Sequence, residues 1–163
     1  MNWQTLFLSA EGRIGRKDFW IGFLILCVIW ILSPILHVLA FLLWLALLYA
    51  WVCLFAKRLH DFGKSGMLIL IPFAVGCVAL VAALIFGGIG AISAIYSASQ
   101  GGSEPANWAV LIGALGVALA FLCVAGLVKL VFILWVGLNP SDAGDNRYGP
   151  PPLAPAPPAP VAP

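Results

Sequence analysis

Long apolar stretches separated by short polar segments dominate the chain. Residues 19–56 contain no charged side chain. As one helix they would be about 57 Å long, whereas the hydrocarbon core of a bilayer is about 30 Å thick. Pro34 disfavours helical structure at the residue before it. We therefore expect two membrane-spanning helices in this stretch, at about 19–34 and 38–57, joined by a tight turn at 33–38.

Two further apolar stretches follow in the second half of the chain. Residues 67–86 and 108–128 have about the 20 apolar residues that a membrane-spanning helix needs. The polar segment 97–107 between them reads as a loop. Lys129 directly follows the last stretch, as an interfacial or intramembrane charge, and residues 130–138 are expected to lie along the interface. The pattern thus predicts an all-α integral membrane protein with four transmembrane helices.

Composition supports the bilayer as the solvent for most of the chain. Apolar residues make up 63% of the sequence, charged residues only 9%, and mean hydropathy is +1.09. A soluble domain is nearer a quarter charged, so a water-soluble fold could not cover this much apolar surface. The net charge of +2, with no basic tract rich in aromatic residues, argues against a nucleic-acid partner.

The ends of the chain differ in composition from the apolar middle. Trp3, Leu6, Phe7 and Ala10 recur at helical spacing and predict a short amphipathic helix on the membrane surface, with a loose, flexible start as the alternative. The prolines and alanines near the C-terminus predict a disordered end. The expected organisation is an N-terminal cytoplasmic or interfacial segment (1–18), a four-helix membrane domain (19–138), an ordered turn motif (139–150) and a Pro/Ala-rich tail (151–163).

Basic residues alternate between the segments that flank the four apolar stretches. They occur before the first stretch, between the second and third, and after the fourth, but not in the other two connections. Cytoplasmic segments carry the excess of Lys and Arg, so we expect both termini in the cytoplasm. The residues concerned are Arg13, Arg16, Lys17, Lys57, Arg58, Lys64 and Arg147.

The most charged short segment is KRLHDFGKSG, residues 57–66. The structural interpretation is a capped turn on the cytoplasmic side between two helices. It requires a cation near Asp61, because a negative charge at a helix C-terminus is unfavourable without one. Gly63 suits a left-handed helix end, and Ser65 can cap the next helix. A functional reading of the same segment is that Lys57, Arg58 and Lys64 hold the phosphate of an anionic lipid.

The adjacent His60 and Asp61 invite a catalytic reading, since such a pair can orient a base or hold a metal. A metal site needs further ligands, however, and His37 is expected on the opposite side of the membrane. The four cysteines stand far apart in apolar runs and are read as packing residues. No metal site and no cofactor are predicted.

Two other motifs flank the membrane domain. GRIGRKDFW, residues 12–20, is either a simple positive anchor or a clamp, in which Arg13 or Arg16 reaches Asp61 across the first helical hairpin. DNRYGP, residues 145–150, contains Asn146 and Arg147 and predicts a turn before the tail, with a plain linker as the alternative.

These three motifs, in this order, resemble the bacterial membrane family known as domain of unknown function 805. The similarity covers roughly residues 12–152 and implies a small multi-pass protein of the bacterial inner membrane. The family has no established activity, so the resemblance implies no catalytic residues. Met67 stands where the family usually has an aromatic residue, and residues of roughly 87–125 look like an added loop and span.

The leading functional hypothesis is a non-enzymatic membrane component that binds a partner protein or anionic lipid headgroups through a cytoplasmic basic face. The alternative is a subunit of an oligomeric small-solute transporter or channel, with Lys129 or residues 57–64 lining the path. A membrane enzyme that uses His60 and Asp61 is a third class. Small residues at four-residue spacing permit close helix packing within one chain or between copies. They are Ala79, Ala83 and Gly87, with Gly116 and Ala120.

Overall fold

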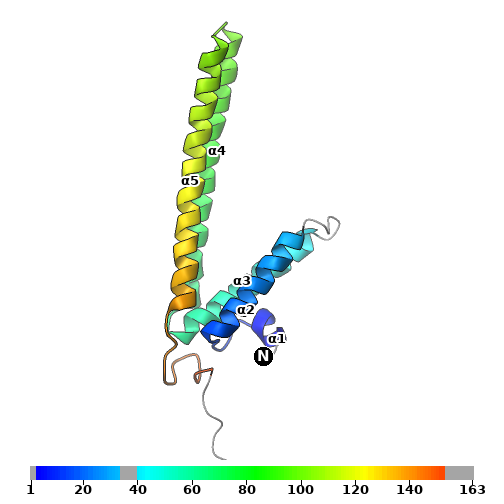
Figure 1. Cartoon of the computed structure of the whole chain (residues 1–163), viewed down its shortest axis with the longest axis vertical. Helices are drawn as coiled ribbons and strands as arrows, with labels where there is room; N and C mark the ends of the chain where they lie inside the picture. Colours follow the sequence, from blue (N-terminus) through cyan, green and yellow to red (C-terminus); the bar gives the residue numbers. More distant parts are fainter. Residues whose placement is uncertain (1–2, 34–39, 153–163) are drawn as a thin grey trace, which may run out of the picture. The chain divides into compact units, whose positions relative to one another are not determined.

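The computed structural model describes residues 3–33 and 40–152 of the chain. This part is helical and contains no strand (Figure 1). The predicted turn at 33–38, with His37, and the tail from residue 153 lie outside the described residues. The elements in order are α1 (Trp3–Leu8), α2 (Arg16–Leu32), α3 (Ala40–Asp61), the 3-10 helix η2 (Gly66–Ile69), α4 (Leu70–Ser99) and α5 (Glu104–Leu138).

Three of the described helical segments are long and apolar enough to cross a membrane. They are Phe41–Asp61, Gly66–Ser99 and Glu104–Leu138. Helix α2 is apolar but has only 17 residues. Two helices continue past the ends of the spans expected from the sequence. Helix α4 runs through the glycines at 87–90 to Ser99, because glycine weakens a helix without necessarily ending it. Residues 130–138 are the last turns of α5 and form no separate element.

The chain divides into two compact units, residues 1–69 with 134–163, and residues 70–133. In the first unit, α2 and α3 pack along each other through aromatic rings. Phe19 is fully buried, and its ring meets that of Phe55 edge-on with centroids 5.1 Å apart. Phe23 and Trp51 pair in the same way one turn further on, at 5.0 Å. Buried aromatic pairs of this geometry add to the stability that burial alone provides.

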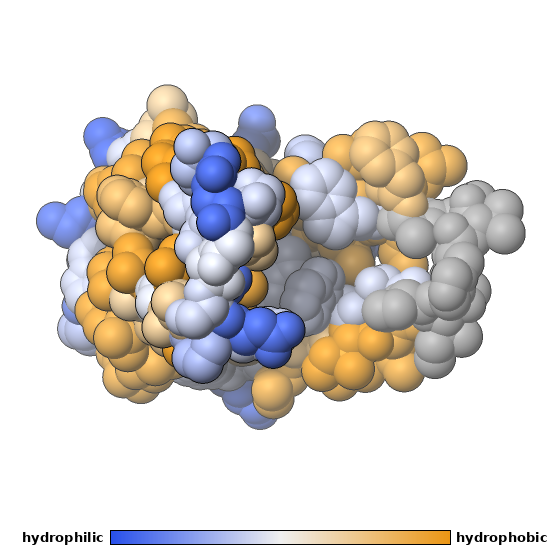
Figure 2. Space-filling view, turned by 90° about the horizontal axis from the view of Figure 1, so that it is seen from above, coloured by the Kyte–Doolittle hydropathy of each residue, from blue (hydrophilic) through white to orange (hydrophobic). Residues whose placement is uncertain are grey.

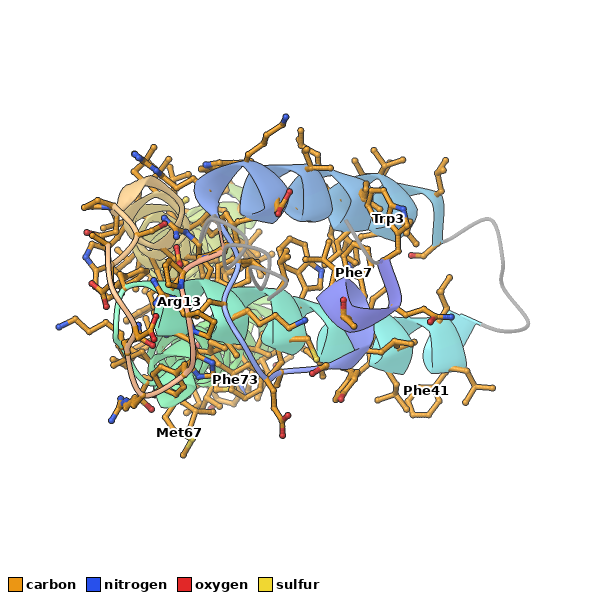
Figure 3. All side chains as sticks on the ribbon, turned by 90° about the horizontal axis from the view of Figure 1, so that it is seen from below. Trp3, Phe7, Arg13, Phe41, Met67 and Phe73 are labelled. Carbon is orange, nitrogen blue, oxygen red and sulfur yellow. The ribbon has the colours of Figure 1, made fainter. Side chains whose placement is uncertain are left out.

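Helix α1 packs on this hairpin, over the seam between α2 and α3 (Figure 3). Leu6 is 3% exposed. It reaches Gly22, where an added Cβ would lie 3.4 Å from Leu6 Cδ2 and 2.8 Å from Leu54 Cδ1. A Cβ at this position would require the end of the Leu54 side chain to shift. The last carbonyls of α1, which lack partners within the helix, accept hydrogen bonds from α3. Lys57 Nζ donates to Thr5 O and Leu6 O, and Tyr49 Oη to Leu8 O.

In the second unit, α4 and α5 run side by side (Figure 1). Ala79 and Ala83 are buried, as the small-residue spacing predicts. The closest approach is at Gly90, where an added Cβ would lie 2.0 Å from Ala114 Cβ. Gly116 and Ala120 are exposed and do not take part in the packing of α4 on α5 within the chain, so their use between copies stays a prediction. In helix α5 it is Ala114 and Ala118 that face α4.

Large apolar side chains cover the outside of this second unit. Ile92 is 70% exposed and Ile112 67%. The visible surface of the molecule is mainly hydrophobic (Figure 2). A surface of this composition is stable against lipid chains rather than water.

Candidate functional site

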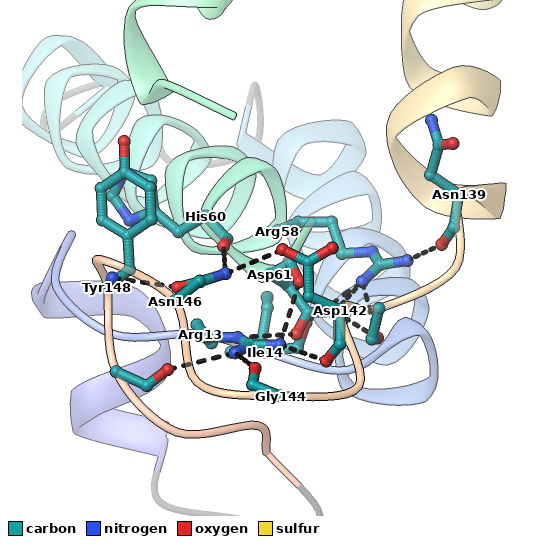
Figure 4. Close-up of polar contacts among 12 residues, drawn as sticks. Arg13, Ile14, Arg58, His60, Asp61, Asn139, Asp142, Gly144, Asn146 and Tyr148 are labelled. Atoms are coloured by element: carbon teal, nitrogen blue, oxygen red, sulfur yellow. Dashed lines mark hydrogen bonds and ion pairs between the residues drawn. The ribbon is translucent and has the colours of Figure 1, made fainter. Parts of the chain in front are cut away.

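Three segments that are far apart in the sequence meet in the first unit (Figure 4). They are the connection between α1 and α2, the C-terminal end of α3, and residues 139–150 after α5. Each contains one of the three motifs singled out in the sequence. The side chains that join them form a buried network of charges.

Asp61 lies at the centre of the network and is completely buried. Its Oδ1 is 3.3 Å from Arg13 Nε. Its Oδ2 pairs with Arg58 Nη1 and accepts a hydrogen bond from Ser141 Oγ. The expected clamp between Arg13 and Asp61 is therefore present. Arg58, one of the neighbours expected for an acid at this helix end, completes it.

Arg13 uses its whole guanidinium group, and its side chain is 1% exposed. Besides Asp61 Oδ1, it reaches four backbone carbonyl groups, two from each terminal nitrogen. Nη1 donates to Gly144 O at 2.8 Å and to Gly149 O at 3.1 Å. Nη2 donates to Asp61 O at 3.1 Å and to Asp142 O at 2.7 Å. An arginine has five N–H donors in a fixed planar arrangement, which lysine cannot reproduce.

Arg58 is the largest fully buried side chain among the described residues. Its Nε donates to Val136 O at 3.2 Å, and its Nη2 donates to Asn139 O. Both carbonyls lie at the end of α5, where no intrahelical partner is available. Its Nη1 also reaches Ile14 O at 3.4 Å. Arg58 thus joins the ends of α3 and α5 to the segment before α2.

The network buries two guanidinium groups around one carboxylate. Burial of charges is costly unless opposite charges and hydrogen bonds compensate, and the carbonyl groups supply that compensation here. Removal of one partner from a buried ion pair costs about 3–5 kcal/mol. We therefore regard Asp61 as the residue on which the association of the three segments depends.

His60 lies beside the network but has a different environment. Its ring stacks on that of Tyr148, with centroids 3.7 Å apart and planes at 9°. Asn146 Nδ2 donates to His60 O at 2.9 Å and to Asp142 Oδ2 at 3.1 Å. Asn146 and Gly149 exchange backbone hydrogen bonds, which gives the turn predicted for this motif. His60 and Asp61 are neighbours in the chain that serve separate contacts. In residues 3–33 and 40–152 no three His, Cys, Asp or Glu side chains are grouped to hold a metal ion.

The cations proposed to hold lipid phosphate fall into two sets. Arg58 is fully buried and Lys57 is 3% exposed, so neither belongs to an exposed basic face. Arg58 pairs with Asp61, as expected for a cation near that acid, whereas the contacts of Lys57 with the carbonyls of α1 had no signature in the sequence. The cations that remain exposed are Arg16, Lys17, Lys64 and Arg147.

Lys129 belongs to the second unit and is also exposed. Its Cε lies 3.3 Å from the position that a Cβ on Gly76 would take. The side chain therefore lies along α4 at a glycine, where space for it is available.

Sequence reasoning missed the residues just after α5. Asn139, Ser141, Asp142 and Gly144 all take part, three of them through backbone carbonyls. Asn139-Pro140-Ser141-Asp142 has the composition of a turn directly after a helix. An ordered turn at 139–150 was expected, but its composition does not say which side chains the segment would contact.

The described residues are all-helical and include three helical segments long and apolar enough to cross a membrane, which defines a membrane-associated helical protein. The chain belongs to the family described as "Protein of unknown function (DUF805)", whose profile matches residues 7–150. It is similar to the uncharacterized protein YiiR of Escherichia coli K12 and of Escherichia coli O157:H7. Each is 29% identical over 157 residues, which cover 91% of this chain and 89% of the relative. No solved structure matches the chain.

Proposed function

We propose that the chain is a non-enzymatic, multi-pass component of the bacterial inner membrane that binds anionic lipid headgroups through its exposed cations. The observation that carries the proposal is the distribution of charge. Seven of the eight Lys and Arg residues belong to the first unit, in or next to the segments that the Asp61 network joins. A cluster of cations at one end of apolar helices is typical of a cytoplasmic membrane face.

The same network supports four crossings. Helix α2 begins two residues after Ile14, whose carbonyl Arg58 binds, and α3 ends at Asp61. Helix α4 leaves nine residues after Asp61, and α5 returns to Asn139, whose carbonyl Arg58 also binds. In this proposal each of α2, α3, α4 and α5 crosses the membrane once, which gives an even number of crossings. In this proposal α2 spans a locally thinned bilayer, and both ends of the membrane domain face the cytoplasm.

Four cations are available to lipid in this arrangement, namely Arg16, Lys17, Lys64 and Arg147, because they are exposed and no described carboxylate pairs with them. Each basic side chain near an anionic membrane surface contributes about 1 kcal/mol to attraction. The attraction weakens with salt, because salt screens exposed charges.

The test is retention of phosphatidylglycerol by purified protein in mild detergent, read by native mass spectrometry at low and high salt. Replacement of all four exposed cations with Gln is expected to weaken retention by more than about tenfold, from the contribution per cation. Lys129→Gln is the matched control, because Lys129 lies in the other unit. Equal retention by the fourfold variant and the native chain would refute the proposal.

The orientation is tested separately. Lys64→Cys in a background without the native cysteines is expected to react with a membrane-impermeant thiol reagent only from the cytoplasmic side. Labelling of intact cells from outside would contradict the four-span arrangement.

A further inference from the structure

A pocket on the side of the α2–α3 hairpin contains a buried cation. Its volume is about 210 Å³, and its lining comes from Thr5 and Leu6 of α1, residues 11–14, Asp18 of α2 and Lys57 of α3. Lys57 is 3% exposed. Both ion pairs found in the described part of the chain belong to Asp61, so Lys57 has no carboxylate partner there.

The hydrogen bonds of Lys57 leave its ammonium group incompletely satisfied. An ammonium has three N–H donors. Lys57 directs two of them to backbone carbonyls, Thr5 O and Leu6 O. A buried charge is unfavourable without an opposite charge nearby. The remaining donor therefore suits an anionic oxygen that enters the pocket.

The acidic side chains of the same pocket also lack partners within the described residues. Glu11 is exposed and Asp18 half-buried, and neither carboxylate takes part in an ion pair or in a side-chain hydrogen bond. The pocket thus presents two accessible carboxylates and two buried cations, of which Arg13 is paired with Asp61 and Lys57 has no described carboxylate partner. A ligand with a phosphate and a primary ammonium a few bonds apart has the complementary charges.

The position of Lys57 favours a membrane lipid as the source of such a ligand. Lys57 lies four residues before Asp61, which is about 6 Å along a helix. If the Asp61 network marks the membrane face, as the proposed function requires, the pocket lies at the depth of phospholipid headgroups. Helix α1, which forms its other wall, presents Trp3 and Leu8 at 50% and 65% exposure, as suits a wall against lipid.

We propose that this pocket binds the phosphoethanolamine headgroup of a zwitterionic phospholipid. Lys57 donates to the phosphate, and Asp18 and Glu11 accept hydrogen bonds from the ammonium. The inference rests on the proposed membrane placement but involves none of the four exposed cations.

The test compares retention of phosphatidylethanolamine and phosphatidylcholine by the purified full-length chain, read by native mass spectrometry in mild detergent. The two lipids share the phosphate and the positive charge, but the choline nitrogen has no N–H to donate. The native chain is expected to retain phosphatidylethanolamine about tenfold better, the usual effect of a lost charge-assisted hydrogen bond. Equal retention of the two lipids would overturn the proposal.

Two variants assign the preference to residues. Asp18→Asn is expected to weaken the preference for ethanolamine, because only Glu11 then keeps its negative charge, and Lys57→Gln is expected to weaken retention of both lipids. Because Lys57 also holds α1, the decisive variant is Asp18→Asn, which removes no contact within the described residues. The control is Asp145→Asn, an exposed acid outside the pocket. An unchanged preference in Asp18→Asn would exclude this pocket as the site.

Soluble phosphoethanolamine, added in competition, distinguishes the two sources of the headgroup. Displacement of the lipid shows that the headgroup alone is recognised, and no displacement shows that the acyl chains contribute. Both results support the site when the Asp18 effect is present. Loss of phosphatidylglycerol retention in the fourfold cation variant, with the ethanolamine preference intact, would separate the two proposals.

Discussion

Replacement of Asp61 by Asn tests the central claim that one carboxylate joins three segments of the chain. The variant keeps the size of the side chain but leaves Arg13 and Arg58 buried without an opposite charge. Breaking a buried ion pair in this way costs about 3–5 kcal/mol. For a protein of this size each kcal/mol lowers the melting temperature by about 2–4 °C, so we expect a decrease of roughly 6–20 °C.

The assay is thermal unfolding of the purified chain in detergent, followed by tryptophan fluorescence. Asp145→Asn is the matched control, because Asp145 is an exposed acid in the segment after α5 with no ion pair to any described residue. It is expected to unfold within about 1–2 °C of the native chain, as surface substitutions usually do. If Asp61→Asn unfolds at the same temperature as Asp145→Asn, the network does not stabilise the fold and the reasoning fails.

Arg13→Lys refines this prediction, because it keeps the charge but removes the planar set of five donors. We expect a smaller loss of stability than in Asp61→Asn, together with faster hydrogen exchange in residues 142–149, whose carbonyls Arg13 holds. Exchange equal to that of the native chain would show that the loop does not depend on Arg13.

Two further substitutions test packing. Gly90→Ala is expected to destabilise the chain by about 1–3 kcal/mol, because the new Cβ would meet Ala114 Cβ at 2.0 Å. The control is Gly113→Ala, which has open space around it and is expected to leave stability unchanged or to raise it. A lower melting temperature for Gly113→Ala than for Gly90→Ala would contradict the contact. Tyr148→Ala removes the ring stacked on His60. We expect faster proteolytic cleavage within residues 139–150, while the membrane helices stay intact. Unchanged cleavage would show that the stack does not fix this segment.

The helical class could be predicted from sequence because its cause is local. A run without charges, such as residues 19–56, has few alternatives to membrane helix once its length is compared with bilayer thickness. Helix ends were less predictable. The span expected at 67–86 is shorter than α4, which continues through Gly87 and Gly90 to Ser99 and packs on α5 at both glycines.

The part of the site that could be predicted is the pairing of opposite charges. An acid in a basic loop needs a cation, and Asp61 does lie between Arg13 and Arg58. The burial of Lys57 was not predictable, because it depends on how α1 packs against α3. The contribution of residues 139–149 was missed for a similar reason. Backbone carbonyl acceptors have no signature in the sequence, since every residue has one.

The network also imposes an order on biosynthesis. The partners of Arg58 include Asn139, which is 81 residues further along the chain, and those of Arg13 include Gly149. At about 5–20 residues per second, Asn139 is added about 4–16 s after Arg58. Until then both arginines lack carbonyl partners that they have in the finished fold. A chain that stops before residue 139 therefore lacks the carbonyl of Asn139 and that of Gly149, and its two arginines stay without these hydrogen bonds.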